Sequence, residues 1–322
     1  MKKSKNLLNK NPIIIVTMVI LALYAASIIV VLAWGALTAF KSDIDFEILG
    51  NYIGWPDLEF SEDEALRFAN FTKVFKYMGT LQYSTAYYSG TTKVAHSLGG
   101  AGQTVSFLTY FIYTVLYVGV GSIILAVVPA VGAYMCAKYK FKFSKIQYTI
   151  YLLFMMIPIV GTYPSELAFL RATGLYDTFI GNWIQKFHFS GMYFFVYFAF
   201  YQGLSDAYAE AAEIDGASQL SVLVKIIMPL SVNMLGAVFL IQFINLWNDY
   251  QTPMLYLPTK PTLAYVVYLF SQLNAPGLSS EVKGKHPVEI AACLMLALPI
   301  LAIYCVFNKK LVGDISMGGI KG

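Results

Sequence analysis

Six long segments of this chain contain no Asp, Glu, Lys or Arg, and they constrain its fold more than any other feature. A helix needs about 17–25 apolar residues to cross the hydrocarbon layer of a membrane. Only 12% of the residues are charged, which is about half the share in a typical soluble domain. The pattern predicts an all-α polytopic membrane protein with six transmembrane helices. The charge-free segments are residues 13–40, 104–137, 146–165, 187–205, 226–248 and 290–308.

The first apolar segment also raises the alternative of a cleaved signal peptide. Its apolar run is far longer than the roughly 7–15 residues of a signal core, and no clear small-residue cleavage site accompanies it. We therefore expect residues 1–40 to form a cytoplasmic amino terminus followed by an uncleaved first transmembrane helix.

Lysine clusters predict the orientation, because short cytoplasmic loops are enriched in Lys and Arg. With six spans, all three clusters fall on one side of the membrane, so both termini are expected in the cytoplasm. Residues 41–103 then form an extracytoplasmic insertion between the first two helices, 104–308 a core domain with five transmembrane helices, and 309–322 a cytoplasmic tail. The clusters are Lys2, Lys3, Lys5 and Lys10; Lys138, Lys140, Lys142 and Lys145; and Lys309, Lys310 and Lys321.

The insertion is acidic at its start and rich in Tyr later. Ser61 and Glu64 have the spacing of a capping box and predict the start of a helix over 61–78. Its aromatic side chains could stack on a sugar ring, but an interfacial belt or a small packed cap is the favoured interpretation. Trp55, Trp183 and Trp247 are expected in such a belt. A second outward segment, residues 251–287, contains an apolar stretch too short to span, which predicts a half-buried helix.

The sequence lacks the motifs of a self-sufficient enzyme or a metal site. No GxxxxGK[ST], HExxH or GxSxG is present, and the three cysteines and three histidines have no metal-ligand spacing. We expect no catalytic residue and no metal. Glu166, Asp249 and Glu289 lie at the ends of apolar segments, where solvated side chains are the favoured interpretation. That position argues against an ion relay through the membrane.

A polar stretch interrupts the apolar segments at residues 210–229, which read EAAEIDGASQLSVLVKIIMP. Helical spacing places Ala209, Ala212 and Glu213 near one face, with Glu210 beside them. Small Ala side chains would allow a partner to approach closely, and the Glu side chains could pair with its Arg or Lys. The stretch predicts a short docking helix on the cytoplasmic face.

Two residues predict how the docking helix ends. Gly216 can end it by adopting a left-handed conformation, and Pro229 lies early in the fifth apolar segment, where a missing N–H costs least.

At this stretch the sequence resembles the permease subunits of ATP-binding-cassette importers, whose cytoplasmic signature is EAA, then G, then I-x-L-P. The matching residues are Glu210, Ala211, Ala212, Gly216, Ile226 and Pro229, with Met228 in place of Leu.

Further residues resemble those of one branch of this family, the permeases of carbohydrate importers. Within that branch they are most similar to the second permease of maltose-type transporters. The variant EAAxIDGA is present at residues 210–217, including Asp215 and Ala217. Trp247, Asn248 and Asp249 are similar to a WND at the outer end of the fifth span, and residues 318–322 to a closing GG-[LI]-KG. The resemblance runs from about residue 104 to the end, includes the first span more loosely, and does not include the insertion.

The resemblance implies a type I importer fold in a bacterial cytoplasmic membrane, a homologous second permease, two ATP-binding subunits and an extracytoplasmic solute-binding protein. ATP and Mg would be bound by the partners, with no cofactor in this chain and no role for nucleic acid. Each ATP-binding subunit would receive one docking helix, and the tail would contact it too. The docking residues are Glu210, Ala211, Ala212, Glu213, Asp215, Gly216, Ala217 and Pro229, and the tail residues are Gly318, Gly319, Lys321 and Gly322.

Candidate pore-facing residues are Tyr163, Asn245 and Asn248, although helix packing explains them equally well. Two other functions remain open from the sequence. An ion-coupled transporter acting alone would need buried acids near the membrane centre and inverted repeats, and neither is apparent. A membrane scaffold that anchors an ATPase for signalling would fit the docking helix as well as a permease does.

Overall fold

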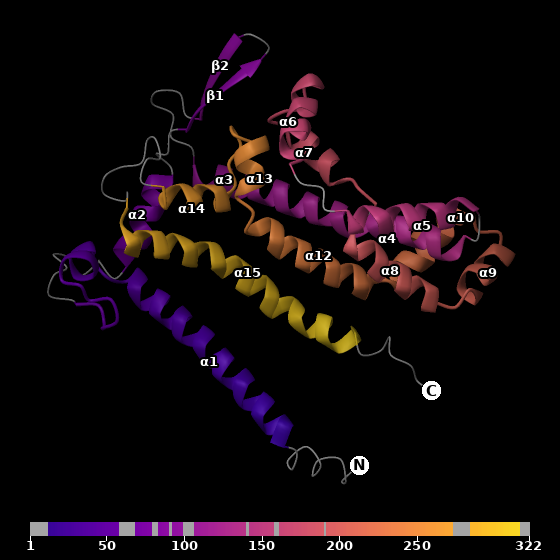
Figure 1. Cartoon of the computed structure of the whole chain (residues 1–322), viewed down its shortest axis with the longest axis horizontal. Helices are drawn as coiled ribbons and strands as arrows, with labels where there is room; N and C mark the ends of the chain where they lie inside the picture. The colour runs from indigo at the N-terminus through magenta and orange to yellow at the C-terminus, as the bar shows by residue number, and fades with distance from the viewer. Residues whose placement is uncertain are drawn as a thin grey trace. The chain divides into compact units, whose positions relative to one another are not determined.

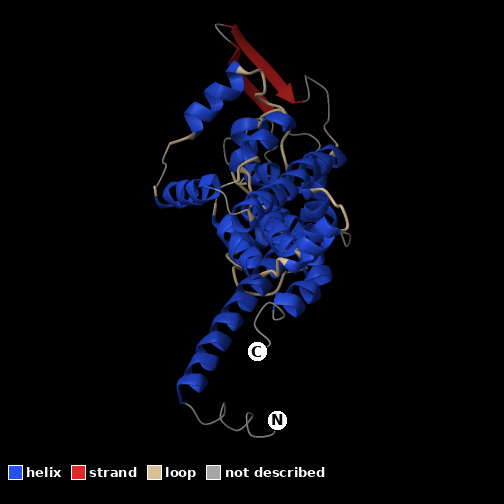
Figure 2. Cartoon of the chain, turned by 90° about the vertical axis from the view of Figure 1, so that its right-hand side faces the viewer, coloured by secondary structure: helices blue, strands red, loops and turns tan. Residues whose placement is uncertain are grey.

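The computed structural model describes residues 12–57, 68–78, 83–89, 92–98, 106–139, 142–157, 161–189, 191–272 and 284–315. The regular secondary structure of these residues is helical apart from one antiparallel hairpin, β1 (Tyr83–Ser89) and β2 (Thr92–Leu98), drawn in red in Figure 2. The helical expectation is therefore confirmed for most of the chain, and the hairpin was not predicted. The chain divides into two compact units, Met1–Met78 with Phe270–Ala297 and Gly79–Leu269 with Leu298–Gly322.

Three described helices are long and apolar enough to cross a membrane. They are α1 (Pro12–Ala39), the continuous stretch Phe107–Lys138, and His286–Cys305 within α15 (His286–Ile315). The stretch Phe107–Lys138 consists of α3 (Phe107–Val115), the π-helical turn η3 (Leu116–Val120) and α4 (Gly121–Lys138). These helices correspond to the first, second and sixth predicted spans.

The third and fourth predicted spans correspond to shorter helices. The third, residues 146–165, is divided between α5 (Lys142–Met156) and α6 (Tyr163–Ala172). Gly161 has φ +82°, which ends a right-handed helix, and Pro164 occupies the first turn of the next. The fourth corresponds to α8 (Met192–Gly203), which rises only ~18 Å at 1.5 Å per residue.

The fifth predicted span contains a sharp bend. The helical segment Gln219–Leu230 meets Val232–Trp247, which is α12, at 73°, and the two pass the membrane test only as a pair. Pro229 lies in the last short helix before the bend, where it cannot donate a backbone hydrogen bond. Ser231 occupies the bend, where its hydroxyl donates to Ile227 O at 2.8 Å and accepts from Tyr201 Oη at 3.2 Å. The segment before the bend comprises α10 (Gln219–Val222), η4 (Leu223–Ile227) and α11 (Met228–Leu230).

Within the second unit, α4, α8 and α12 lie side by side (Figure 1). The side of α4 facing this core carries small residues, Ala126, Ala130 and Ala133, which let neighbouring helices approach closely. Large aromatic side chains fill the space beside them, and Phe194 and Tyr197 of α8 are fully buried. This core supports the polar stretch described below.

Three further short helices are α7 (Phe179–Lys186), α13 (Gln251–Tyr256) and α14 (Leu263–Phe270), and only the last residue of α14 falls outside the second unit. The expected half-buried helix is α14, and it is more deeply buried than predicted, with Val266 and Phe270 fully inaccessible. Its amino end is fixed by Thr114 of α3, whose hydroxyl accepts from Leu263 N at 2.8 Å.

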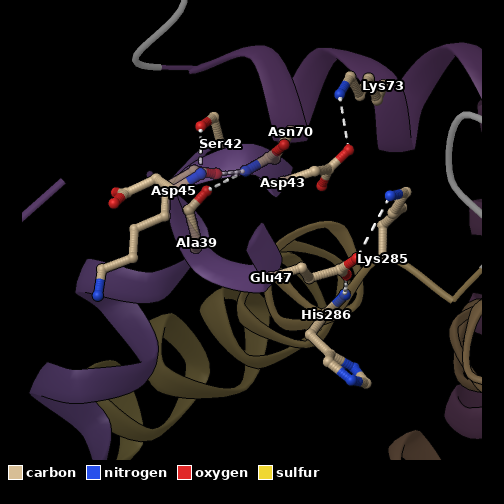
Figure 3. A network of polar contacts seen from close by, with 10 residues as sticks. Ala39, Ser42, Asp43, Asp45, Glu47, Asn70, Lys73, Lys285 and His286 are labelled. Carbon is tan, nitrogen blue, oxygen red and sulfur yellow. Dashed lines mark hydrogen bonds and ion pairs between the residues drawn. The ribbon is translucent and has the colours of Figure 1, made fainter. Parts of the chain in front are cut away.

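The first unit folds the start of the insertion onto the end of α1 and the start of α15, through η1 (Ile44–Ile48) and α2 (Ala69–Met78). Figure 3 shows the polar contacts that hold it. The Asn70 amide donates to Ala39 O and to Lys41 O, both at 2.8 Å. Glu47 forms an ion pair of 3.3 Å with Lys285. The capping box at Ser61 lies outside the described residues.

Candidate functional site

The polar stretch forms a separate helix, α9 (Ala207–Ile214), directly after α8. Lys138, at the carboxyl end of α4, fixes the start of α9. Its ammonium donates to Leu204 O and forms an ion pair of 2.7 Å with Asp206. The start of α9 is therefore attached to the end of a membrane helix, so a displacement of one is transmitted to the other.

The carboxyl end of α9 has the hydrogen bonds of a Schellman motif. Ala217 N donates to Ala212 O at 2.9 Å, and Gly216 N donates to Glu213 O at 3.0 Å. Gly216 has φ +83°, as the sequence predicted, and a Cβ built there would meet nothing within 4 Å. Glycine is therefore required here for the backbone conformation and not for lack of space.

The alanine face of α9 packs inward, which corrects one expectation. Ala212 is buried at 8% exposure in the core that contains Tyr134, Tyr201 and Val222, and Ala209 and Ala217 pack partly against the same core. These small side chains let α9 lie close to its own chain, and Ala212 is too deeply buried to contact a partner. The sequence pattern did not distinguish these two uses of alanine.

The exposed side of α9 carries the groups that a partner can contact. Glu210, Ala211 and Asp215 are exposed, and Ile214 is 86% exposed. Ile214 was not predicted as a site residue, although its sequence signal is a large apolar residue directly before Asp-Gly on a polar helix. An isolated exposed apolar side chain among acidic groups suits insertion into an apolar cleft with a basic rim.

The Glu213 side chain is hydrogen-bonded within its own chain. Gln219 Nε2 donates to Glu213 Oε1 at 2.6 Å, and Tyr139 Oη donates to Gln219 Oε1. This relay braces the turn after α9 against the end of α4. Among the described residues, the side chains of Glu210 and Asp215 make no hydrogen bond or ion pair, so both acidic groups remain available to a partner.

The other predicted site residues are less closely grouped. Pro229 is exposed in α11, at the bend and not on α9. Asn245 and Asn248 are exposed and share one face of α12, whereas Tyr163 lies on α6, 56% exposed, with its ring 6.5 Å from that of Tyr256. The tail residues Gly318, Gly319, Lys321 and Gly322 lie outside the described residues.

The carboxylate at the end of α12 is hydrogen-bonded and partly buried, which corrects the expectation of a solvated side chain. Tyr117 Oη donates to Asp249 Oδ2 at 2.6 Å, and Lys186 lies 4.4 Å from the centre of the Tyr117 ring. Lys186 also donates to Asn182 Oδ1. Burial lowers the pKa of Lys186 to about 8, partly offset by the nearby Asp249. Trp247, expected in an interfacial belt, is buried at 3% exposure.

Glu166 is likewise bonded. Tyr256 Oη donates to its Oε2 at 2.7 Å and Gln185 Nε2 donates to the same atom at 3.2 Å. Glu289, in the first turn of α15, lies 3.4 Å from His286 Nδ1. The three acids remain at helix ends, as predicted; Asp249 and Glu166 join neighbouring helices, whereas Glu289 contacts His286 of its own helix. Among the described residues no group of three His, Cys, Asp or Glu could hold a metal ion.

Comparison with known proteins gives one consistent similarity. The family described as "Binding-protein-dependent transport system inner membrane component" matches residues 130–309, more than half of the chain. The melibiose/raffinose/stachyose import permease protein MelC of Bacillus subtilis is 24% identical over 70% of this chain and 81% of its own length. The maltose/maltodextrin transport system permease protein MalG of Vibrio vulnificus is 26% identical over 67% of this chain and 73% of its own.

A solved structure shares the fold. It is the crystal structure of a bacterial ABC transporter involved in the import of the acidic polysaccharide alginate, and its matching chain superimposes with a TM-score of 0.66 at 20% identity. The match covers 92% of this chain and 95% of that one. The resemblance that the sequence indicated for part of the chain therefore applies to the fold of nearly all of it.

Proposed function

Because this chain belongs to the family of binding-protein-dependent transport system inner membrane components, we propose that it is a pore-forming permease subunit of an ATP-driven importer of a sugar or oligosaccharide. The relatives named above, two of them sugar permeases, support this substrate class. The chain is a multi-pass membrane protein and not itself the catalytic subunit. The ion-coupled alternative gains no support, because the partly buried acids lie at helix ends.

The observation that carries the proposal is the construction of α9. It is an exposed helix with a rigid glycine-dependent end, attached to α4 through Lys138 and to α10 through Gln219. A helix held at both ends can move as a rigid body with the membrane helices to which it is joined. ATP-driven closure of a partner that grips Ile214 and Glu210 would thus be transmitted to α4 and to the bent segment before α12.

The partners follow from the family role. The proposed complex contains a homologous second permease, two ATP-binding subunits that hold ATP and Mg, and an extracytoplasmic solute-binding protein. In the proposed topology six helices cross the bacterial inner membrane with both termini in the cytoplasm. Three of these spans would be the long helices described above. The other three would be α5, α8 and the bent pair formed by Gln219–Leu230 and α12.

Transport in this proposal is alternating access. ATP binding brings the two ATP-binding subunits together, the two docking helices move with them, and the permeases turn from inward-open to outward-open. The exposed stripe of α12 with Asn245 and Asn248 would face the pore or the second permease, because neither side chain packs inward. The tail at Gly318 to Gly322 would contact the ATP-binding subunits.

Labelling of a cysteine at position 214 tests the docking role. Ile214→Cys, in a chain whose Cys136, Cys293 and Cys305 are replaced by Ala, should react with a maleimide in membranes stripped of ATP-binding subunits and be protected in the intact complex. Gln202→Cys, exposed at the end of α8 and off the docking helix, is the matched control and should react equally in both. Equal reactivity of position 214 in the two preparations would contradict the docking role.

A further inference from the structure

A cluster of exposed apolar side chains follows η1 in the first unit. Residues 48–55, with the sequence ILGNYIGW, contain no charged residue. We call this segment the apolar loop. Its five large side chains are mostly accessible in the structure: Ile48 76%, Leu49 52%, Tyr52 54%, Ile53 85% and Trp55 80%. A soluble surface rarely gathers so many large apolar groups within eight residues, so the loop requires a covering.

The loop lies beside the last turns of α1 and does not project away from it. Trp34 Nε1 donates to Tyr52 O at 2.7 Å. Trp34 is five positions before the end of α1 at Ala39, and at 1.5 Å per residue this is ~7 Å back along the helix axis. The chain thus leaves α1, turns through η1 and returns to the level of Trp34 in α1.

The turn that returns the loop is rigid. Asn51 Nδ2 donates to Asp45 Oδ1 at 2.8 Å and to Trp55 O at 2.9 Å. Lys41 donates to Asn51 O, and Gly50 has φ +68°, a conformation suited to glycine. Asp45 and Lys41 are both 1% exposed. Lys41 and Asp45 are therefore turned inward, whereas Glu47 and Asp57, which flank the loop, are exposed and the apolar groups between them point outward.

We propose that the apolar loop inserts into the headgroup and acyl boundary of the bilayer on the side where α1 ends, and anchors the first unit to the lipid surface. The exposed apolar surface of α1 extends as far as Trp34, and the loop meets it there, because Trp34 donates to Tyr52 O. Tyr and Trp suit this depth, with apolar rings and polar tips. Inserted apolar groups would hold the folded stem of the insertion in a fixed orientation above the membrane.

Spin labels measure the depth directly. A nitroxide label is attached at Ile53→Cys or at Ile48→Cys in the cysteine-free chain. The labelled chain is assembled in its complex and placed in phosphatidylcholine–phosphatidylglycerol vesicles. Lys76→Cys on the exposed side of α2 is the control. We expect both loop labels to be relaxed more by oxygen, which concentrates in lipid, than by a water-soluble nickel chelate, and the control label to show the reverse. Trp34→Phe, which keeps an aromatic ring and loses the donor, should raise nickel access at position 53.

Three outcomes would overturn the proposal. Loop labels as accessible to nickel as the control would place the loop in water. Loop labels shielded from both reagents would show that protein covers it. A shielded state seen only after a solute-binding protein is added would identify the loop as a protein docking surface. Transport activity does not enter these readouts, so failure of the anchor is distinguishable from failure of the importer role.

Discussion

Replacement of Gly216 tests the link between backbone conformation and coupling. Its φ of +83° places it in the left-handed region, and a Cβ there meets no atom within 4 Å. A side chain therefore adds a conformational cost without a clash. Adoption of that region costs an L-residue about 1–2 kcal/mol, and a β-branched residue resists it most. Asn tolerates it far better.

This conformational free energy determines the fraction of molecules that form the native turn. A penalty of about 1–2 kcal/mol reduces the native turn by roughly 5–30-fold relative to competing conformations. Loss of the turn breaks the bonds from Gly216 N and Ala217 N and releases Ile214 from its fixed orientation. We therefore expect the sugar imported per ATP hydrolysed to fall in the order Gly, Asn, Ala, Val, while the complex still assembles in the membrane.

The assay is sugar uptake and ATP hydrolysis in the same proteoliposomes. Gly203→Val is the matched control, because Gly203 also has open space around its Cβ position and does not have a left-handed φ. It should keep the wild-type ratio of uptake to hydrolysis. A Gly216→Val complex that imports sugar at the wild-type ratio would refute the reasoning, as would equal losses in Gly203→Val and Gly216→Val.

Three other perturbations test separate parts of the account. Glu210→Lys should weaken assembly with the ATP-binding subunit and Glu210→Gln should weaken it less, so an unchanged yield of purified complex for Glu210→Lys would contradict the docking role. Deletion of residues 318–322 should change the ATPase rate more than membrane insertion, and wild-type rates with wild-type assembly would disprove the tail contact. Burial lowers the pKa of Lys186 from 10.5 to about 8, so the unfolded chain binds more protons between these values. The melting temperature of wild type relative to Lys186→Met in detergent should then rise from pH 8 to pH 10, and a difference independent of pH would contradict this assignment.

Features encoded by neighbouring residues were predictable from the sequence. The first apolar run predicted residues 13–40 and became α1 at Pro12–Ala39. The left-handed turn at Gly216 followed from Asp-Gly after a helical pattern, and the end of the fifth apolar run predicted the end of α12 to within a residue. In each case the determining interactions are local, either the exclusion of charge from lipid or the backbone freedom of glycine.

Features that depend on distant partners were not predictable. The direction of Ala212 is set by the aromatic core of α4 and α8, and the burial of Trp247 by its neighbours in the folded unit. Asp249 lies at a helix end as expected, but its bond to Tyr117 joins residues 132 positions apart. The hairpin of β1 and β2 formed from a segment whose Tyr content suggested an interfacial belt or a small packed cap. Without knowledge of those partners, the same residues fit a solvated or lipid-facing position equally well.

The central claim is that this chain works inside an ATP-driven import complex. Its most direct test is affinity purification from the native membrane in mild detergent, with identification and quantification of every copurifying chain. The account predicts one copy of a homologous permease and two copies of an ATP-binding subunit for each copy of this chain. Purification of the chain alone, or as an oligomer of itself, would contradict it.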